Sequence, residues 1–320
     1  MRVVRYHEHG GPEVLRVDDV EPPEPGPGEL RIDTRAVGVN PVDTYFREGS
    51  YPVPELPWIP GSDVAGVVDA AGRGADVEPG TRVFATGTLG NDRQGTYAEQ
   101  VLVPADWAAE LPEGCAFEEG AALGLVGLTA WRAFVEFARV EPAERVLVHG
   151  GSGGVGHVAV QIADAMGARV TTTARRDYHD YLRQLGASTV VDYRQDDDEL
   201  AAAITDAGAP DVVLDTHFDD YLQLDADVAA HGGRVVCIGN DAASARLDAA
   251  GAAKSKDVGF QFMTMFSAPD VGGALDRLAT LAEDGRVVPE IARTYSLEEA
   301  AEAQRAVLRD SFRGKLVIVP

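Results

Sequence analysis

A glycine-rich run near the middle of the chain has the residue types that bind a diphosphate. Residues 149–156 read His-Gly-Gly-Ser-Gly-Gly-Val-Gly, between an apolar segment at 145–148 and apolar residues at helical spacing over 155–166. Such a turn needs glycine because the backbone must bend tightly and approach the phosphates, while the following helix offers free N–H groups. An ordinary surface turn is the alternative, which the flanking strand and helix disfavour. The predicted dinucleotide-binding residues are Gly151, Ser152, Gly153, Gly154, Val155 and Gly156.

Two arginines stand where the choice between NADH and NADPH is made. The strand predicted over 169–173 is followed by Ala174, Arg175 and Arg176, where NAD-binding enzymes carry an acidic residue about 20 residues after the glycines. A guanidinium binds a 2′-phosphate through a fork of N–H donors, whereas a carboxylate repels it. The sequence therefore predicts NADPH. The alternative is that both arginines are solvated at the start of the next helix.

The charge of the chain restricts its partners. Its 52 acidic residues outnumber 28 Lys and Arg, which gives a net charge of −24, and the only lysines are Lys254, Lys256 and Lys315. An acidic surface repels nucleic acid phosphates and anionic lipids, so we expect neither a nucleic acid nor a membrane as partner. Such an acid excess with few lysines predicts a halophilic protein, because counterions at high salt screen the self-repulsion.

Length, cysteine content and hydropathy indicate a cytoplasmic protein of two domains. The chain has 320 residues, of which 45% are hydrophobic, enough for two cores. Two cysteines, Cys115 and Cys237, are too few for a thiolate zinc site and form no disulfide framework. We predict no signal peptide at the N-terminus and no apolar run of the roughly 18 to 20 residues that span a membrane.

The period of the apolar pattern changes along the chain. Up to about residue 120, short β-rich runs at 31–39, 64–70, 82–86 and 97–103 are separated by Pro and Gly clusters. Beyond residue 122, strands are predicted near 145–149, 169–173, 189–193, 211–215 and 234–238, with helices between them. Repeated βα units of this length indicate a doubly wound parallel sheet. The fold class is therefore α/β, a β-rich domain followed by a dinucleotide-binding domain.

Six ordered motifs carry a family resemblance. They lie at 38–43, 47–51, 60–68, 95–99, 127–130 and 149–156, and the similarity continues to Gly314 and Lys315. In these residues the chain resembles the medium-chain dehydrogenase/reductase superfamily, and most of all its zinc-free quinone oxidoreductases, the zeta-crystallin group. The resemblance implies a GroES-like catalytic domain at 1–122, a Rossmann domain at 123–260 and a C-terminal return to the catalytic domain at 261–320. It also implies an active site between the domains.

The resemblance further implies a site without zinc. Zinc-dependent relatives carry Cys and His ligands where this chain has 40–43 and Ser62-Asp63. Without a Lewis acid, the substrate must already be electrophilic, as quinones and enones are. The family's first motif then places Asn40, Asp43, Tyr45 and Tyr51 in the substrate pocket. Asn40 hydrogen-bonds substrate or nicotinamide, Asp43 orients its neighbours, and a tyrosine hydroxyl donates to the developing oxyanion. Ordinary packing is the alternative for the tyrosines, and Arg47 is expected to pair with Asp43.

The family pattern also assigns cofactor residues outside the glycine run. Thr129 is placed near the nicotinamide ribose and phosphates, Tyr193 beside the adenosine phosphate, and Gly239 with Asn240 along the nicotinamide. A hydroxyl bonded to its own helix is the alternative for Thr129. Two departures from the pattern are the absence of a lysine near the 2′-phosphate and the bulky, acidic segment 215–220 where relatives have a small turn.

Three functions remain in view for this chain. The first is NADPH:quinone reduction, and the second is NADPH-dependent reduction of an activated double bond in an enone, alkenal or enoyl thioester, for which Tyr51 is the expected proton donor. The third is a non-catalytic, crystallin-like NADPH-binding protein. Kinship also predicts a homodimer formed through an edge strand at 259–263.

Overall fold

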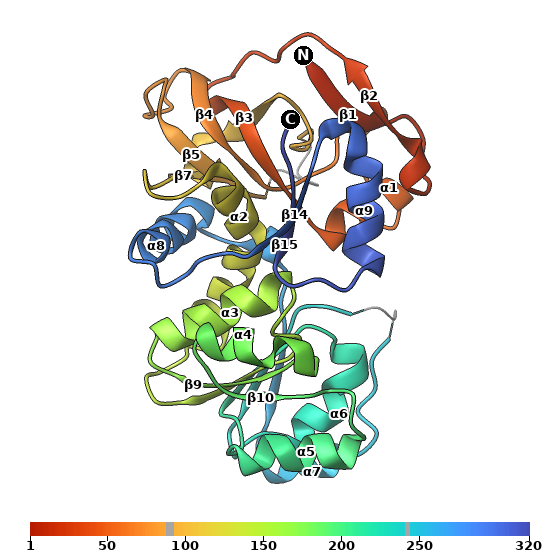
Figure 1. Ribbon diagram of the computed structural model, residues 1–320, viewed down its shortest axis with the longest axis vertical. Helices are drawn as coiled ribbons and strands as arrows, with labels where there is room; N and C mark the ends of the chain where they lie inside the picture. Colours follow the sequence, from red (N-terminus) through yellow and green to blue (C-terminus); the bar gives the residue numbers. More distant parts are fainter. Residues whose placement is uncertain (88–92, 241–243) are drawn as a thin grey trace. The chain divides into compact units, whose positions relative to one another are not determined.

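The chain folds into two compact units. The structure is a computed structural model that describes residues 1–87, 93–240 and 244–320 (Figure 1). One unit comprises Met1–Leu128 with Ala268–Pro320, and the other comprises Thr129–Ser267. The boundaries predicted from the sequence, after residues 122 and 260, fall a few residues before these. We call the two parts the terminal unit and the central unit.

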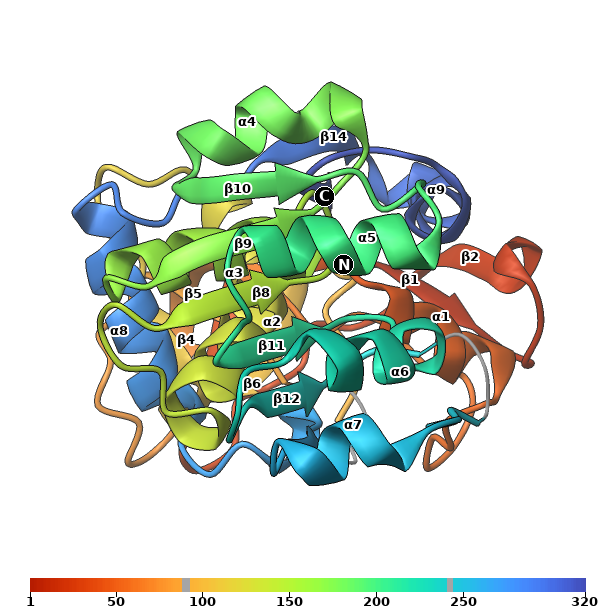
Figure 2. The same cartoon turned by 90° about the horizontal axis from the view of Figure 1, so that it is seen from below.

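The central unit is built on six parallel strands in the order β10-β9-β8-β11-β12-β13. Figure 2 shows β10, β9, β8, β11 and β12 side by side in this order. The centres of β8, β11 and β12 are buried Val and Leu, as expected for a sheet covered on both faces. The strands are β8 (Arg145–Val148), β9 (Arg169–Thr173), β10 (Ala187–Val191), β11 (Val212–Asp215), β12 (Arg234–Cys237) and β13 (Gly259–Phe262). The helices are α3 (Gly154–Ala165), α4 (His179–Gln184), α5 (Asp197–Asp206), α6 (Phe218–Val228) and α7 (Ala250–Ser255).

This strand order is that of a dinucleotide-binding Rossmann fold. The chain starts at the middle of the sheet with β8, moves outward to β10, and then returns to build the other half from β11. The order reverses between β8 and β11, and ligands of open α/β sheets bind beyond the carboxyl ends of strands at such a point. The glycine-rich run follows β8 directly, so it lies at this switch point.

The terminal unit contains a mainly antiparallel sheet in the order β14-β15-β3-β4-β5-β7, with β6 also paired to β3. The last strand of the chain, β15, pairs antiparallel with β3 and brings Leu316 opposite Val39. The strands are β1 (Arg2–Tyr6), β2 (Leu15–Asp19), β3 (Glu29–Val39), β4 (Val64–Ala71), β5 (Arg82–Ala85), β6 (Gln100–Pro104), β7 (Ala108–Glu110), β14 (Ile291–Tyr295) and β15 (Lys315–Ile318). The helices are α1 (Pro41–Glu48), α8 (Val271–Glu283), α9 (Ala300–Arg309) and most of α2 (Phe117–Trp131), whose residues from Thr129 onward belong to the central unit.

One long helix differs from the sequence expectation. Residues Phe117–Phe137, which include α2, are long and apolar enough to pass a length and composition test for a membrane span. Of its most apolar window, 72% is buried inside the protein. A buried apolar helix is typical of the core of a globular protein, and its polar residues Glu118, Glu119 and Arg132 hide it from a search for unbroken apolar runs.

The strand β10 begins two residues earlier than predicted. Gly186 ends the preceding helical segment in the left-handed conformation, with φ of 106°, and the chain enters the sheet at once with Ala187 opposite Val170. Tyr193 therefore lies beyond the end of β10, in the segment where ligands of such sheets bind.

Candidate functional site

The glycine turn after β8 cannot accept a larger side chain at two of its positions. A Cβ on Gly156 would lie 2.1 Å from the carbonyl oxygen of Gly150, and a Cβ on Gly151 would lie 2.0 Å from the Thr172 hydroxyl. Gly150 itself has a φ of 68°. The turn therefore packs α3 tightly on the sheet, and the glycines are required by the geometry that the sequence predicts.

Thr173 at the end of β9 fixes the first amides of the turn. Its hydroxyl accepts a hydrogen bond from the N–H of Gly150 at 3.0 Å, and its carbonyl accepts one from Gly151 at 2.9 Å. The N–H groups in the first turn of α3, which include those of Gly154 and Val155, have no acceptor within their own helix. They are the donors that this turn can offer to a diphosphate.

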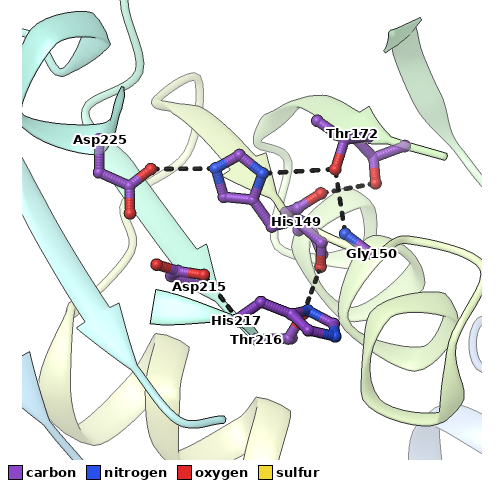
Figure 3. Close-up of polar contacts among 9 residues, drawn as sticks. His149, Gly150, Thr172, Asp215, Thr216, His217 and Asp225 are labelled. Carbon is purple, nitrogen blue, oxygen red and sulfur yellow. Dashed lines mark hydrogen bonds and ion pairs between the residues drawn. The ribbon is translucent and has the colours of Figure 1, made fainter. Parts of the chain in front are cut away.

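A buried histidine stands at the start of the turn. The His149 imidazole is fully buried and contacts the Asp225 carboxylate at 2.9 Å (Nε2 to Oδ1) and the Thr173 hydroxyl at 3.3 Å (Nδ1 to Oγ1). Figure 3 shows the hydrogen bonds that lead from Asp225 through the His149 ring toward Gly150. Burial lowers the pKa of His149 to about 4, so its ring is neutral near pH 7.

The predicted 2′-phosphate residues lie at the carboxyl ends of neighbouring strands. Arg175 and Arg176 follow β9 and Tyr193 follows β10, and the N–H of Ala174 donates to the carbonyl of Val191 at 2.9 Å. Arg175 stacks on the Tyr178 ring and donates to its hydroxyl at 3.1 Å, but its Nε is buried without an acceptor among the described residues. Neither arginine forms an ion pair with a described carboxylate.

Three other predicted cofactor residues also lie in the central unit. Gly239 comes shortly after β12 and packs against the backbone that follows β11. A Cβ on Gly239 would lie 2.3 Å from the Thr216 carbonyl oxygen. Asn240 comes next and is exposed, and Thr129 is buried on α2. Gly239 thus marks a close backbone approach at the switch point, whereas contacts of Thr129 and Asn240 with a cofactor stay predictions.

A second polar cluster lies in the terminal unit around Asn40 and Asp43. The Asp43 carboxylate accepts hydrogen bonds from the Asn40 N–H at 2.9 Å and from the Tyr97 hydroxyl at 3.0 Å, and so anchors the start of α1. The Asn40 amide donates to Asp63 at 2.8 Å and accepts from Lys315 at 2.5 Å. Both residues are buried, so this geometry makes them positioning residues, and a contact of Asn40 with substrate stays a prediction.

Lys315 is the buried cation of this cluster. Its Nζ donates to the Val39 carbonyl at 2.8 Å and lies 4.0 Å from the Asp63 carboxylate. Burial lowers the pKa of Lys315, and burial also raises the pKa of Asp63 and that of Asp43, the latter to about 7. Two carboxyl groups thus share one ammonium in a region without water-exposed surface.

The two predicted tyrosines form an aromatic group at the end of α1. The Tyr51 ring packs edge-on against Tyr45 at 5.8 Å and against Phe46 at 5.3 Å between ring centroids. Tyr51 is 42% exposed, whereas Tyr45 is partly buried. An aromatic group with one exposed tyrosine suits a planar, electron-poor substrate, and a substrate contact stays a prediction for both tyrosines.

The structure corrects one expected pairing and adds residues that the sequence analysis missed. Arg47 does not pair with Asp43: its guanidinium is buried and donates to Glu48, to Gln304 at 2.5 Å and to the Gly10 carbonyl at 3.0 Å. Among the missed residues, Lys315 had a signal in the sequence, since it is one of three lysines and stands in an apolar strand. The partners of His149 had none.

Comparisons with known proteins show which family this chain resembles. Residues 26–113 match the model of the alcohol dehydrogenase GroES-like domain, and residues 185–318 match that of the zinc-binding dehydrogenase. Human quinone oxidoreductase is 37% identical over 100% of this chain and 98% of its own length. The structure of Escherichia coli quinone oxidoreductase complexed with NADPH has a TM-score of 0.88 at 28% identity, and covers 100% of both chains. A structure described as an NAD-dependent alcohol dehydrogenase has a TM-score of 0.91 at 31% identity, again over 100% of both chains.

One of the matched family models is named for zinc binding, but the described parts of the chain offer no set of residues that fits zinc. No group of three or more His, Cys, Asp or Glu side chains there is placed to hold a metal ion. Asp63 and Asp43 are the acidic groups of the terminal-unit cluster, and both already interact with the Lys315 ammonium. This donor set does not fit tetrahedral zinc, which takes Cys and His ligands first of all. That the protein works without zinc stays a prediction, which elemental analysis checks.

Proposed function

The chain belongs to the quinone oxidoreductase family of the medium-chain dehydrogenase/reductase superfamily, and on this premise we propose that it is an NADPH:quinone oxidoreductase that uses no metal ion. The observation that carries the proposal is the glycine turn after β8, closed by Thr173 and flanked on the next strand by two guanidinium groups. NADPH bound there supplies the hydride for a two-electron reduction. The turn and α3 hold its diphosphate, and Arg175 with Arg176 holds its 2′-phosphate.

The choice of NADPH is supported by charge. The 2′-phosphate is the one feature that distinguishes NADPH from NADH, and Arg175 and Arg176 are cations without a carboxylate partner in the described structure. The similar alcohol dehydrogenase is described as NAD-dependent, so the fold alone does not select the cofactor. The similar quinone oxidoreductase of Escherichia coli, by contrast, forms a complex with NADPH.

Removing both guanidinium groups is expected to abolish the preference for NADPH. In Arg175→Ala/Arg176→Ala, kcat/KM with NADPH falls about 100-fold, because two hydrogen bonds between charged groups contribute about 1.5 kcal/mol each at the least. The value with NADH changes by less than about threefold, because no 2′-phosphate is present. Arg194→Ala is the matched control, since Asp192 already neutralises that exposed arginine. An equal loss with both cofactors would contradict the assignment.

The substrate proposal rests on the terminal unit. In place of a metal, its cluster offers buried hydrogen bonds around Asn40 and an aromatic group around Tyr51. Quinones accept hydride without a Lewis acid because the developing charge spreads over the ring, and a hydroxyl donor is sufficient to stabilise it. The tyrosines position such a ring by stacking and edge contacts.

The exposed residue Tyr51 also favours a second candidate, reduction of activated carbon–carbon double bonds. The test is NADPH oxidation with 1,4-benzoquinone and 9,10-phenanthrenequinone against 2-alkenals and crotonyl thioesters. For a quinone reductase, Tyr51→Phe keeps quinone turnover within about threefold, because a quinone oxygen takes its proton from water. For a double-bond reductase, the same change lowers alkene turnover about 100-fold, since carbon needs a placed proton donor. Tight NADPH binding without turnover of either panel would indicate the non-catalytic, crystallin-like protein.

Three further proposals concern the state of the protein. A homodimer formed through β13 is supported by the place of this strand at the edge of its sheet and by Phe262, which is 62% exposed. Light scattering in molar KCl tests it.

Adaptation to high salt is supported by the net charge of −24, and a Tm that stays flat from millimolar to molar KCl would contradict it. A cytoplasmic location is supported by two free cysteines, Cys115 and Cys237.

A further inference from the structure

A chain of hydrogen bonds runs from α6 to the glycine turn through the interior of the central unit. Asp225 on α6 bonds to His149, His149 bonds to the Thr173 hydroxyl, and that hydroxyl accepts from the Gly150 N–H. The His149 ring also stacks on Tyr221, with 4.4 Å between centroids and 11° between planes. The ring is neutral, so one of its nitrogens donates and the other accepts, and the protonation state of Asp225 decides which.

When Asp225 is ionised, each hydrogen bond of the chain runs in one direction from donor to acceptor. As an ionised carboxylate, with the proton of the acidic pair on its neighbour, Asp225 only accepts hydrogen bonds, so His149 donates from Nε2 and accepts at Nδ1. The Thr173 hydroxyl then donates to Nδ1, which leaves its oxygen free to accept the N–H of Gly150. A change at Asp225 therefore reaches the first amide of the turn through two intermediate bonds.

Asp215 completes the cluster from the end of β11. Its Oδ1 accepts from the backbone N–H of His217 at 2.8 Å. The second oxygens of Asp215 and Asp225 are both buried and have no hydrogen-bond partner among the described residues. The two carboxyl groups influence one another's pKa, and Figure 3 shows both beside the His149 ring. Ionised oxygens only accept hydrogen bonds, so a proton between them is what satisfies both.

We propose that Asp215 and Asp225 share one buried proton, and that this proton holds the His149–Thr173 chain in place and thereby sets how tightly the glycine turn binds the diphosphate of NADPH. Asp215, Asp225 and His149 are positioning residues, since they act on the cofactor through Thr173. The cofactor part of this inference rests on the proposed function.

The proton is lost in a defined range of pH. Burial raises the pKa of Asp215 to about 8 and that of Asp225 to about 7, from 3.8 in the unfolded chain, so the folded state holds a proton that the unfolded chain releases. The stability that depends on it is present in acid, declines as the pH rises, and is gone above about pH 8. Two buried carboxylates then repel each other beneath the turn.

Three neighbouring groups keep their charge state while Asp215 and Asp225 lose their proton. Burial raises the pKa of Tyr221 on α6 to about 12 and also raises the pKa of the Cys237 thiol on β12. His149, which directly follows β8, stays neutral. The 2′-phosphate of NADPH is a dianion throughout, because its second pKa is about 6.

The test compares the Kd of NADPH by fluorescence titration at pH 7.0 and pH 9.5, together with the Tm of the protein without NADPH. We expect the wild type to bind about 10-fold more weakly at pH 9.5 and to lose Tm. Asp215→Asn keeps its affinity between the two pH values and loses less Tm than the wild type, because its amide permanently donates to Asp225 while its oxygen still accepts from His217. Asp227→Asn, an exposed residue of the same helix, keeps the wild-type pH response.

A second pair of variants tests the connection to the turn. Thr173→Val removes the hydroxyl and is expected to raise the Kd of NADPH about 10-fold at pH 7.0 with kcat nearly unchanged, whereas Thr173→Ser restores tight binding. The same alkaline weakening in Asp215→Asn as in the wild type, or wild-type affinity in Thr173→Val, would overturn the inference. If the wild type binds no NADPH at any pH, the proposed function and the cofactor part fall together, while the Tm comparison still decides the shared proton.

Discussion

Gly156→Ala is expected to weaken NADPH binding by at least about 100-fold, the loss of two charge-assisted hydrogen bonds to the diphosphate. The added Cβ would lie 2.1 Å from the Gly150 carbonyl oxygen and 2.7 Å from the Gly151 Cα. Both neighbours are backbone atoms, so no flexible side chain can move away. The helix must instead shift from the sheet, which displaces the amides that face the phosphates.

The controls for this variant come from other glycines. A Cβ on Gly153 would meet the Gly150 carbonyl oxygen at 3.3 Å, so Gly153→Ala is expected to displace the backbone of the turn less than Gly156→Ala does. Gly251 on α7 has open space around it, and Gly251→Ala should bind NADPH as the wild type does. Isothermal titration with NADPH measures all three, with Tm as the check of folding. Near wild-type affinity in Gly156→Ala would mean that the turn does not hold the diphosphate.

The turn and the parallel sheet follow from local sequence, which is why they could be predicted. A glycine required by close packing is visible as a glycine, and a strand buried on both faces is visible as a short apolar run such as 145–148. Arg175 and Arg176 could be placed for the same reason, because residues that directly follow a parallel strand lie at the ligand-binding edge. Family resemblance added Tyr51 and Gly239, which no local pattern distinguishes.

Contacts between distant segments could not be predicted in this way. Asp225 reaches His149 across 76 positions, and Lys315 reaches Asn40 across 275. Nothing in an amphipathic helix marks one aspartate as buried, and Asp227 two positions later is exposed. The same limit explains Arg47: Asp43, four residues earlier, was the nearest acid by helical spacing, yet packing turns the guanidinium toward Gln304 on α9.

Lys315→Met is expected to cost about 3 to 5 kcal/mol of unfolding free energy, the usual effect of removing one partner from a buried ion pair. Native proteins are stable by only about 5 to 15 kcal/mol, so the variant is near the limit of folding. Without the ammonium, the Val39 carbonyl loses a donor, and the carboxyl groups of Asp63 and Asp43 lose the charge that compensates their burial. Urea unfolding at pH 7.5 measures the loss, and Lys254→Met, an exposed lysine, should change stability by less than about 0.5 kcal/mol.

The pH dependence of Lys315→Met separates lost charge from lost packing. Without Lys315, the pKa of Asp63 and of Asp43 in the folded state rises further above the unfolded value of 3.8, because the ammonium lowers both. A raised carboxyl pKa means that stability is retained in acid and lost as the pH rises. The deficit of the variant is therefore expected to be small near pH 5 and full at pH 7.5.

In Lys315→Met/Asp63→Asn the carboxylate is removed as well, so the double variant should lose about 1 to 3 kcal/mol less stability than the two single losses added together. Additive losses that do not change with pH would show that Lys315 acts by packing alone, and that the charges in this cluster are not coupled.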